Sequence, residues 1–213
     1  KALVEVLGRP LIDFGLRTLA AAGLRDVVVN QHHLGDQVRA CVGNGSRWGL
    51  HVEYSPEDPL QGSGGGIRQA RPLLGDATVV TLNADTLAGV ELGPLIDEHR
   101  RRGAVATMVL RRDEEAERYG AIRIRADGRI QRFLEHAAPE PAAPTEAFMF
   151  TGVQILEPRV FDFMTEGPFS ITEVTYPRML AAAVPLFGTV FEGPWLTVGT
   201  PEERAYAEGE LRR

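Results

Sequence analysis

Hydrophobic and polar positions follow a regular alternation in the first part of the chain. Short apolar runs at 26–30 and 79–82 predict strands buried within a sheet, and residues 50–54 predict a further strand. Apolar residues recur at helical spacing over 10–20 and 34–42, which predicts two helices, each leading into a strand. This alternation of helix and strand predicts a doubly wound sheet whose neighbouring strands are parallel.

The second part of the chain shows a different pattern. Residues 121–125 and 129–134 alternate with period two around an Ala-Asp-Gly turn signal at 126–128, which predicts an antiparallel hairpin. Ser170, followed three positions later by Glu173, fits a capping box at a helix start. The same patterns predict strands at 148–156 and 186–191, a helix over 158–164 and a terminal helix over 201–211.

Taken together, these elements predict one α/β domain that covers residues 1–213. We expect a Rossmann-like three-layer α/β/α architecture with a mainly parallel mixed sheet and a small antiparallel extension near residues 119–135. The segment 139–144, rich in proline and alanine, is expected to form an exposed loop.

Composition narrows the classes of function. The 213 residues suit a single domain of ordinary size, and the formal net charge of −6 without an extended basic block argues against nucleic-acid binding. One cysteine, Cys41, fits a reducing compartment and predicts a cytoplasmic protein. No apolar run approaches the ~18 residues of a membrane span, so neither membrane insertion nor a signal peptide is expected.

A carboxylate follows one of the predicted strands. The run at 79–82 ends in Asn83-Ala84-Asp85, and ligands of open α/β sheets bind beyond the carboxyl ends of the strands. A carboxylate there can hold Mg²⁺, which needs few protein ligands when substrate phosphates supply the others. The alternative is that Asp85 only caps the following turn.

A glycine-rich stretch precedes a helical pattern over 67–74. Residues 62–66 read Gly-Ser-Gly-Gly-Gly, and glycines allow close backbone approach while a helix start offers N–H groups to anions or base carbonyls. A dinucleotide fingerprint requires a strand that runs directly into the glycines, whereas Ser-Pro-Glu-Asp-Pro occupies 55–59 here. A Rossmann oxidoreductase is therefore disfavoured, and a plain flexible loop is the remaining alternative.

Several motifs in a fixed order resemble those of sugar-1-phosphate nucleotidylyltransferases. This family comprises the NDP-sugar pyrophosphorylases, including mannose-1-phosphate guanylyltransferases and related uridylyltransferases. Its signature triphosphate loop and its first strand would lie upstream of Lys1, because KALVEVLGRPLI is similar to the segment that follows that loop. The motifs that carry the resemblance are GSGGGIR (62–68), NADT (83–86), YGAIRIRADGRIQRFLEHA (119–137), FTGVQIL (150–156) and WLTVGTPEE (195–203).

The resemblance implies a nucleotide diphospho-sugar transferase fold and a single displacement reaction. A sugar-1-phosphate oxygen attacks the α-phosphorus of a nucleoside triphosphate, and an NDP-sugar and pyrophosphate are formed with Mg²⁺ as cofactor. By the same resemblance, Lys1 contacts the nucleotide phosphates and Asp85 binds Mg²⁺. Gly62, Ser63 and Gly65 read the base and sugar of the nucleotide.

The sugar 1-phosphate is implied to bind at four further positions. By resemblance, the backbone of Gly120 approaches the sugar phosphate and Glu135 accepts hydrogen bonds from sugar hydroxyls. Gly152 lies in the strand that lines the sugar pocket. His136 stands where the family usually has a lysine that binds the sugar phosphate.

Other positions also depart from the family pattern. Thr197 occupies the place of a second metal-binding aspartate, and Phe150-Thr151 replaces an asparagine often found before the pocket glycine. These departures keep a second hypothesis open, in which the chain is a non-catalytic homologue that binds nucleotide or sugar ligands or serves as a regulatory subunit. The sequence leaves the nucleobase, the sugar and assembly into a homo-oligomer undetermined.

Overall fold

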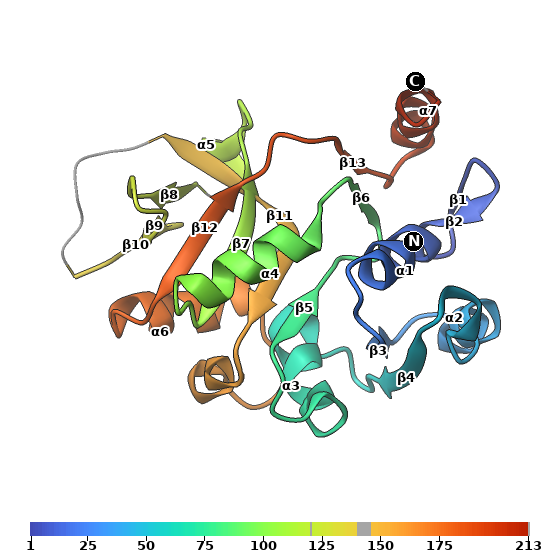
Figure 1. Cartoon of the computed structure of the whole chain (residues 1–213), viewed down its shortest axis with the longest axis horizontal. Helices are drawn as coiled ribbons and strands as arrows, with labels where there is room; N and C mark the ends of the chain where they lie inside the picture. Colours follow the sequence, from blue (N-terminus) through green and yellow to red (C-terminus); the bar gives the residue numbers. More distant parts are fainter. Residues whose placement is uncertain (120, 140–145, 213) are drawn as a thin grey trace. The chain divides into compact units, whose positions relative to one another are not determined.

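The computed structural model describes residues 1–119, 121–139 and 146–212. Contacts divide the chain into two compact units (Figure 1), and each is described by itself. Unit 1 comprises Lys1–Pro56, Leu82–Gly93 and Gly193–Arg213, and unit 2 comprises Glu57–Thr81 and Pro94–Glu192. The single domain over 1–213 stays a prediction. Gly120 and nearly all of the loop predicted at 139–144 lie outside the described residues.

Unit 1 contains the β-α-β order that the sequence predicts. Strands β3 (Asp26–Gln31) and β4 (His51–Pro56) are parallel, and helix α2 (Gly35–Val42) connects them together with a short 3-10 turn, η1 (Ser46–Trp48). The other elements of unit 1 are β1 (Glu5–Val6), β2 (Arg9–Pro10), α1 (Leu11–Ala21), β6 (Thr86–Ala88), β13 (Trp195–Thr197), α7 (Pro201–Glu210) and the first residues of α4 (Leu92–Arg101).

Two hydrophobic clusters hold unit 1 together. One lies between α1, α2 and the β3–β4 pair, where the apolar faces of both helices are covered. The other brings α7, β6 and α1 together, although these elements are far apart in sequence. Their buried members are Ile12, Leu16, Val38, Val42, Leu50 and Val52 in the first cluster, and Val6, Leu11, Leu87, Val198 and Ala207 in the second.

Unit 2 is built on a sheet in which seven strands are described. The strand order is β10-β9-β8-β11-β7-β12, and β5 also pairs with β11. The strands are β5 (Val79–Thr81), β7 (Ala106–Arg111), β8 (Ile122–Ile124), β9 (Ile130–Phe133), β10 (His136–Ala137), β11 (Ala147–Leu156) and β12 (Leu186–Val190). The helices are α3 (Gly62–Leu74), most of α4, α5 (Ala116–Tyr119), the 3-10 helix η2 (Pro158–Phe163), the π-helix η3 (Ile171–Thr175) and α6 (Tyr176–Ala181).

The prediction of a mainly parallel sheet is wrong. Strand β11 is antiparallel to β5, β7 and β8, and within the described main sheet only β12 and β7 form a parallel ladder. Because β11 lies in the middle of the sheet and runs opposite to each of these three neighbours, this one reversed strand makes three ladders antiparallel. Hydrophobic periodicity predicts that a strand exists but carries no information on its direction. The residues of β5, expected to be buried, are also partly exposed.

The predicted hairpin is confirmed. Strands β8 and β9 are antiparallel, and Gly128 at the turn has φ +84°, a conformation that glycine adopts without strain. The side chain of Asp127 accepts a hydrogen bond from the N–H of Arg129 at 3.0 Å, which closes the turn. The antiparallel extension continues through β10, which carries His136.

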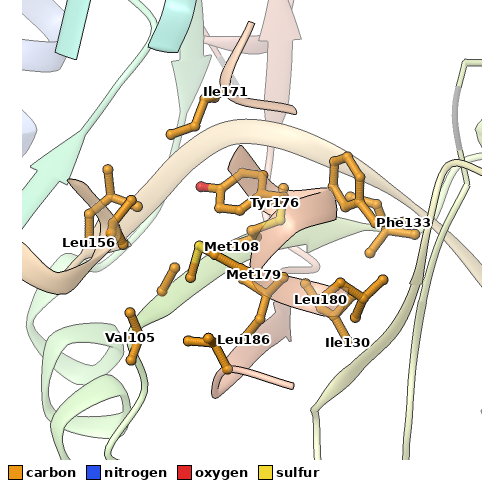
Figure 2. Close-up of a cluster of buried hydrophobic side chains, with 14 of the residues drawn as sticks. Val105, Met108, Ile130, Phe133, Leu156, Ile171, Tyr176, Met179, Leu180 and Leu186 are labelled. Carbon is orange, nitrogen blue, oxygen red and sulfur yellow. The ribbon is translucent and has the colours of Figure 1, made fainter. Parts of the chain in front are cut away.

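The core of unit 2 surrounds Tyr176 (Figure 2). Tyr176 is fully buried, and its ring contacts Phe133 at a centroid distance of 5.5 Å. The Tyr176 hydroxyl donates to the Gln154 side chain, so its polar group is satisfied inside the core. Met108 and Met179 lie beside it in Figure 2. Among the described residues, no helix is long and apolar enough to cross a membrane.

Candidate functional site

Asp85 lies at the start of a short ladder between distant parts of unit 1. Strands β6 and β13 pair antiparallel, with Thr86 opposite Thr197 and Ala88 opposite Trp195. Asp85 immediately precedes this ladder, and its side chain is 41% exposed. The pairing therefore brings the NADT and WLTVGTPEE motifs together, which sequence spacing alone does not predict.

Lys1 supplies a positive charge beside Asp85. Its Nζ lies 3.8 Å from Oδ2 of Asp85, and the Lys1 side chain is 67% exposed. An ion pair this exposed contributes at most about 1 kcal/mol to stability. Both charged groups thus remain accessible to a ligand, and the pair suits the binding of phosphate oxygens and a cation.

The segment after β13 lies next to the same lysine. A Cβ atom placed on Gly199 would be 3.8 Å from Nζ of Lys1 and 3.1 Å from Oε2 of Glu203. Glu203 accepts hydrogen bonds from the N–H groups of Gly199 and Thr200, while the Thr200 hydroxyl accepts from the N–H of Glu203 at 3.2 Å. This capping box begins α7 and fixes the path of the backbone beside Lys1.

The capping box predicted at Ser170 is absent, and the box lies at Thr200 instead. At the predicted position, the Ser170 hydroxyl pairs with the Thr172 hydroxyl, and the Ser170 side chain caps no backbone N–H. The correct box was visible as Thr-Pro-Glu-Glu at 200–203, with proline at the first helical position. Both segments have a serine or threonine followed three positions later by glutamate, but only the segment at 200–203 begins a regular α-helix.

The donor set around Asp85 fits a weakly held metal. Among the described residues, no three histidine, cysteine, aspartate or glutamate side chains group in a way that would hold a metal ion. One half-exposed carboxylate suits Mg²⁺, which keeps several waters and takes its other ligands from substrate phosphates. Thr197 is exposed beside this position and offers a neutral hydroxyl.

The glycine-rich stretch is the first turn of a helix rather than a loop. Helix α3 begins at Gly62, five residues before the predicted start at Ile67. The N–H groups of Gly64 and Gly65 donate to the carbonyl of Phe169, at 2.9 and 3.3 Å. The Ser63 hydroxyl accepts from the N–H of Ile171 at 3.1 Å. Phe169 was missed by sequence reasoning, because no motif marks a partner a hundred residues away.

Glu135 and His136 lie at the end of the hairpin. Both are exposed, and His136 stands opposite Phe133 in the β9–β10 pair. Leu134 before them has φ +53°, which makes the tight turn that separates β9 from β10. The hairpin thus carries a carboxylate and an imidazole on its surface, where they can contact a polar ligand.

Gly152 lies in an irregular part of β11. Its φ is +87°, and the register against β7 shifts between Phe150 and Gln154. The buried hydroxyl of Thr151 donates to the carbonyl of Val109 at 2.8 Å. Thr151 therefore supports the bulge from inside the sheet, which gives a structural reason for a threonine at this departure from the family pattern.

The predicted site residues fall into separate groups. Unit 1 brings Lys1 and Asp85 together, with the segment that follows Thr197 beside them. Unit 2 carries the remaining described candidates on three elements. Their roles in binding nucleotide, sugar or metal stay predictions. These candidates are Gly62, Ser63 and Gly65 on α3, Glu135 and His136 at the hairpin end, and Gly152 on β11.

Comparison with protein families matches residues 1–211 to the family described as Nucleotidyl transferase. A mannose-1-phosphate guanylyltransferase of Mycobacterium tuberculosis is 29% identical over 215 residues, covering all of this chain and 59% of the relative. A UTP–glucose-1-phosphate uridylyltransferase of Synechocystis is 27% identical over 228 residues, covering 58% of that relative. A mannose-1-phosphate guanyltransferase of Yarrowia lipolytica is 30% identical over 95% of this chain and 56% of its own length. The chain thus spans less than three fifths of these relatives.

Solved structures share the fold at low sequence identity. A glucose-1-phosphate thymidylyltransferase candidate from Bacillus anthracis, solved with sucrose, superposes with a TM-score of 0.81 at 20% identity, over 100% of this chain and 86% of the other. HddC of Yersinia pseudotuberculosis, complexed with GMP-PN, superposes with a TM-score of 0.79 at 16% identity, over 99% and 89%. The mixed α/β fold is therefore that of the nucleotidyl transferases.

Proposed function

Because the chain belongs to the nucleotidyl transferase family, we propose that it transfers a nucleoside monophosphate from a nucleoside triphosphate to a sugar 1-phosphate. A phosphate oxygen of the sugar 1-phosphate forms a bond to the α-phosphorus. The bond from that phosphorus to the bridging oxygen breaks, and pyrophosphate leaves. The named relatives act on glucose and mannose 1-phosphates, which supports this substrate class.

The observation that carries the proposal is the grouping of Lys1 and Asp85 beside the backbone that follows β13. Both substrates are polyanions, so the protein has to position them and offset their charge. The ammonium group of Lys1 binds phosphate oxygens, and its neighbouring carboxylate attracts a divalent cation. No nucleophilic side chain is required for a single displacement.

Asp85 would hold Mg²⁺ together with substrate oxygens and waters. When bound, the ion would offset charge that develops on the phosphates. Lys1 is 3.8 Å from this carboxylate and would bind an adjacent phosphate oxygen, which orients the triphosphate. Glu135 and His136 would contact the sugar 1-phosphate from the hairpin, the first by accepting from hydroxyls and the second by donating to phosphate.

A pyrophosphate-release assay tests the proposal in the full-length protein, including whatever precedes Lys1 and follows Arg213. Four nucleoside triphosphates are paired with glucose, mannose and other hexose 1-phosphates at saturating Mg²⁺. We expect release that depends on both substrates together. Release from the triphosphate alone would indicate a hydrolase and would contradict the proposal.

A second candidate function is a non-catalytic ligand-binding homologue. The observation in its favour is the neutral, exposed Thr197 beside Asp85, where the resemblance implies a second carboxylate. Calorimetry against nucleoside triphosphates and NDP-sugars distinguishes the two functions. Binding of either ligand without pyrophosphate release under any substrate pair would favour the non-catalytic function.

A further inference from the structure

The first turn of α3 is held by a distant segment of unit 2. The Phe169 carbonyl accepts hydrogen bonds from the N–H groups of Gly64 and Gly65, and the Phe169 N–H donates to the carbonyl of Gln61 at 2.9 Å. Phe169 lies between η2 and η3 and is nearly buried, with 8% of its surface exposed. Bonds in both directions fix the glycine-rich turn against this one residue.

Three glycines of the turn leave space that this segment fills. A Cβ atom on Gly62 would lie 2.7 Å from the Phe169 carbonyl oxygen, and one on Gly65 would lie 2.8 Å from the Gly167 carbonyl oxygen. A Cβ atom on Gly64 would overlap the Phe169 ring itself. Real Cβ atoms do not approach other heavy atoms so closely. The glycine pattern is therefore required for packing, independently of any ligand.

Other contacts account for most of the polar groups in this turn. The N–H of Gln61 donates to the buried carboxylate of Glu57 at 2.8 Å, and the Ser63 hydroxyl accepts from Ile171. In the described part of the chain, the N–H groups of Gly62 and Ser63 have no hydrogen-bond partner. Both residues are exposed. The first N–H groups of a helix are those that an external acceptor can reach.

We propose that Phe169 is a positioning residue for the nucleotide. Its carbonyl oxygen accepts hydrogen bonds from the N–H groups of Gly64 and Gly65. The N–H groups of Gly62 and Ser63 then remain available to donate to acceptor oxygens or nitrogens of the base and ribose. Gly65, which the resemblance placed among the nucleotide-reading residues, acts in packing. This inference rests on the proposed function, and it names which donors of the turn serve it.

The test adds a methyl group at Gly64 and then removes part of the Phe169 ring that this methyl group would overlap. Gly64→Ala is expected to raise KM for the nucleoside triphosphate at least tenfold and to leave KM for the sugar 1-phosphate unchanged. Phe169→Leu removes the outer ring atoms, so Gly64→Ala combined with Phe169→Leu is expected to recover most of the loss. Gly93→Ala is the matched control, because a Cβ atom there has no neighbour within 4 Å.

Two results would overturn the positioning role. One is a Gly64→Ala variant with a lower Tm but an unchanged KM for the triphosphate. That result would show that the contact between Gly64 and Phe169 stabilises the fold without positioning the nucleotide. The other is a double variant that is no better than Gly64→Ala in either Tm or KM.

Hydrogen exchange provides the second measurement. The amides of Gly64 and Gly65 are expected to be protected without ligand, whereas those of Gly62 and Ser63 are expected to become protected only with a nucleoside triphosphate. Gly62 and Ser63 amides that stay unprotected at saturating nucleotide would overturn the assignment. Absence of nucleotide binding in the parent would contradict the proposed function and the positioning role. The Tm values of the parent, Gly64→Ala, the double variant and Gly93→Ala would still show whether Gly64 packs against the Phe169 ring.

Discussion

Thr197 lies directly opposite Thr86 in the antiparallel pair of β6 and β13, and Thr86 follows Asp85 in the chain. The neutral threonine therefore stands beside the carboxylate that we assign to the metal, across a ladder that joins residues more than a hundred positions apart. Because Thr197 is exposed, an acid introduced at this position displaces no buried side chain.

Thr197→Asp is expected to raise turnover or to lower the Mg²⁺ concentration at half-maximal rate. A second carboxylate increases cation affinity because Mg²⁺ then depends less on substrate oxygens. A tenfold gain would correspond to about 1.4 kcal/mol of barrier. The rate of pyrophosphate release over a Mg²⁺ titration measures it.

Thr197→Asn is the matched control, since it has the size of aspartate without the charge. It should leave the Mg²⁺ dependence at the parental value. Equal gains in both variants would show that size and not charge is responsible. Robust parental activity with no gain from the aspartate would mean that another carboxylate completes the site.

Tyr176→Phe is expected to lower the free energy of unfolding by about 1–3 kcal/mol, because it leaves the buried Gln154 side chain without its donor. Urea unfolding followed by circular dichroism measures the change. Tyr206→Phe is the control, since Tyr206 is 63% exposed and should give a change within about 0.5 kcal/mol. A Tyr176→Phe variant as stable as the parent would contradict the role of this hydrogen bond.

The sequence predicts most elements of the fold but not their pairing. Period-two alternation around Asp127 and Gly128 marks both strands of the hairpin, because turn geometry is a local property. The direction of β11 depends on contacts with three strands distant in sequence, and no local pattern encodes it. The same limit applies at the candidate site. The residue types of Lys1 and Asp85 are recognisable, whereas the capping of Gly64 by Phe169 emerges only from tertiary packing.

We expect His99 to make the stability of unit 2 depend on pH. It is completely buried, with Nδ1 2.8 Å from the Thr107 hydroxyl and Nε2 3.0 Å from the Glu157 carboxylate. Burial lowers the pKa of His99, and the hydrogen bond and charge of Glu157 oppose this shift only in part. The unfolded chain, with a histidine pKa near the ordinary value of about 6.5, therefore binds a proton that the folded protein resists.

Stability is consequently expected to be full above about pH 6.5 and to fall as the pH drops below that value. The measurement is the difference between the pH profiles of unfolding free energy for the parent and for His99→Gln, which removes this titration. His33→Gln makes the same residue change at an exposed histidine outside the core and serves as the control. A His99→Gln profile identical to that of the parent between pH 5 and 7 would contradict the prediction.

Thr200→Ala is expected to lower stability by about 1 kcal/mol, because it removes the hydroxyl that caps the first turn of α7. The backbone at Gly199 lies beside Lys1, so we also expect a higher KM for the nucleoside triphosphate. Thr200→Ser retains the cap and should restore both values. A serine variant as impaired as the alanine variant would show that the hydroxyl is not the relevant group.

The most direct test of the proposed function follows label from an α-³²P nucleoside triphosphate into an NDP-sugar, using the full-length protein and Mg²⁺. Asp85→Asn preserves the size of the side chain and removes its charge. Asp76→Asn makes the same change at an exposed aspartate outside the candidate site. We expect transfer in the parent and in Asp76→Asn, and a loss of at least roughly a hundredfold in Asp85→Asn, about 2.7 kcal/mol of barrier. Equal transfer in Asp85→Asn and Asp76→Asn would contradict the assignment of Asp85, and no transfer by the parent with any sugar 1-phosphate would contradict the activity itself.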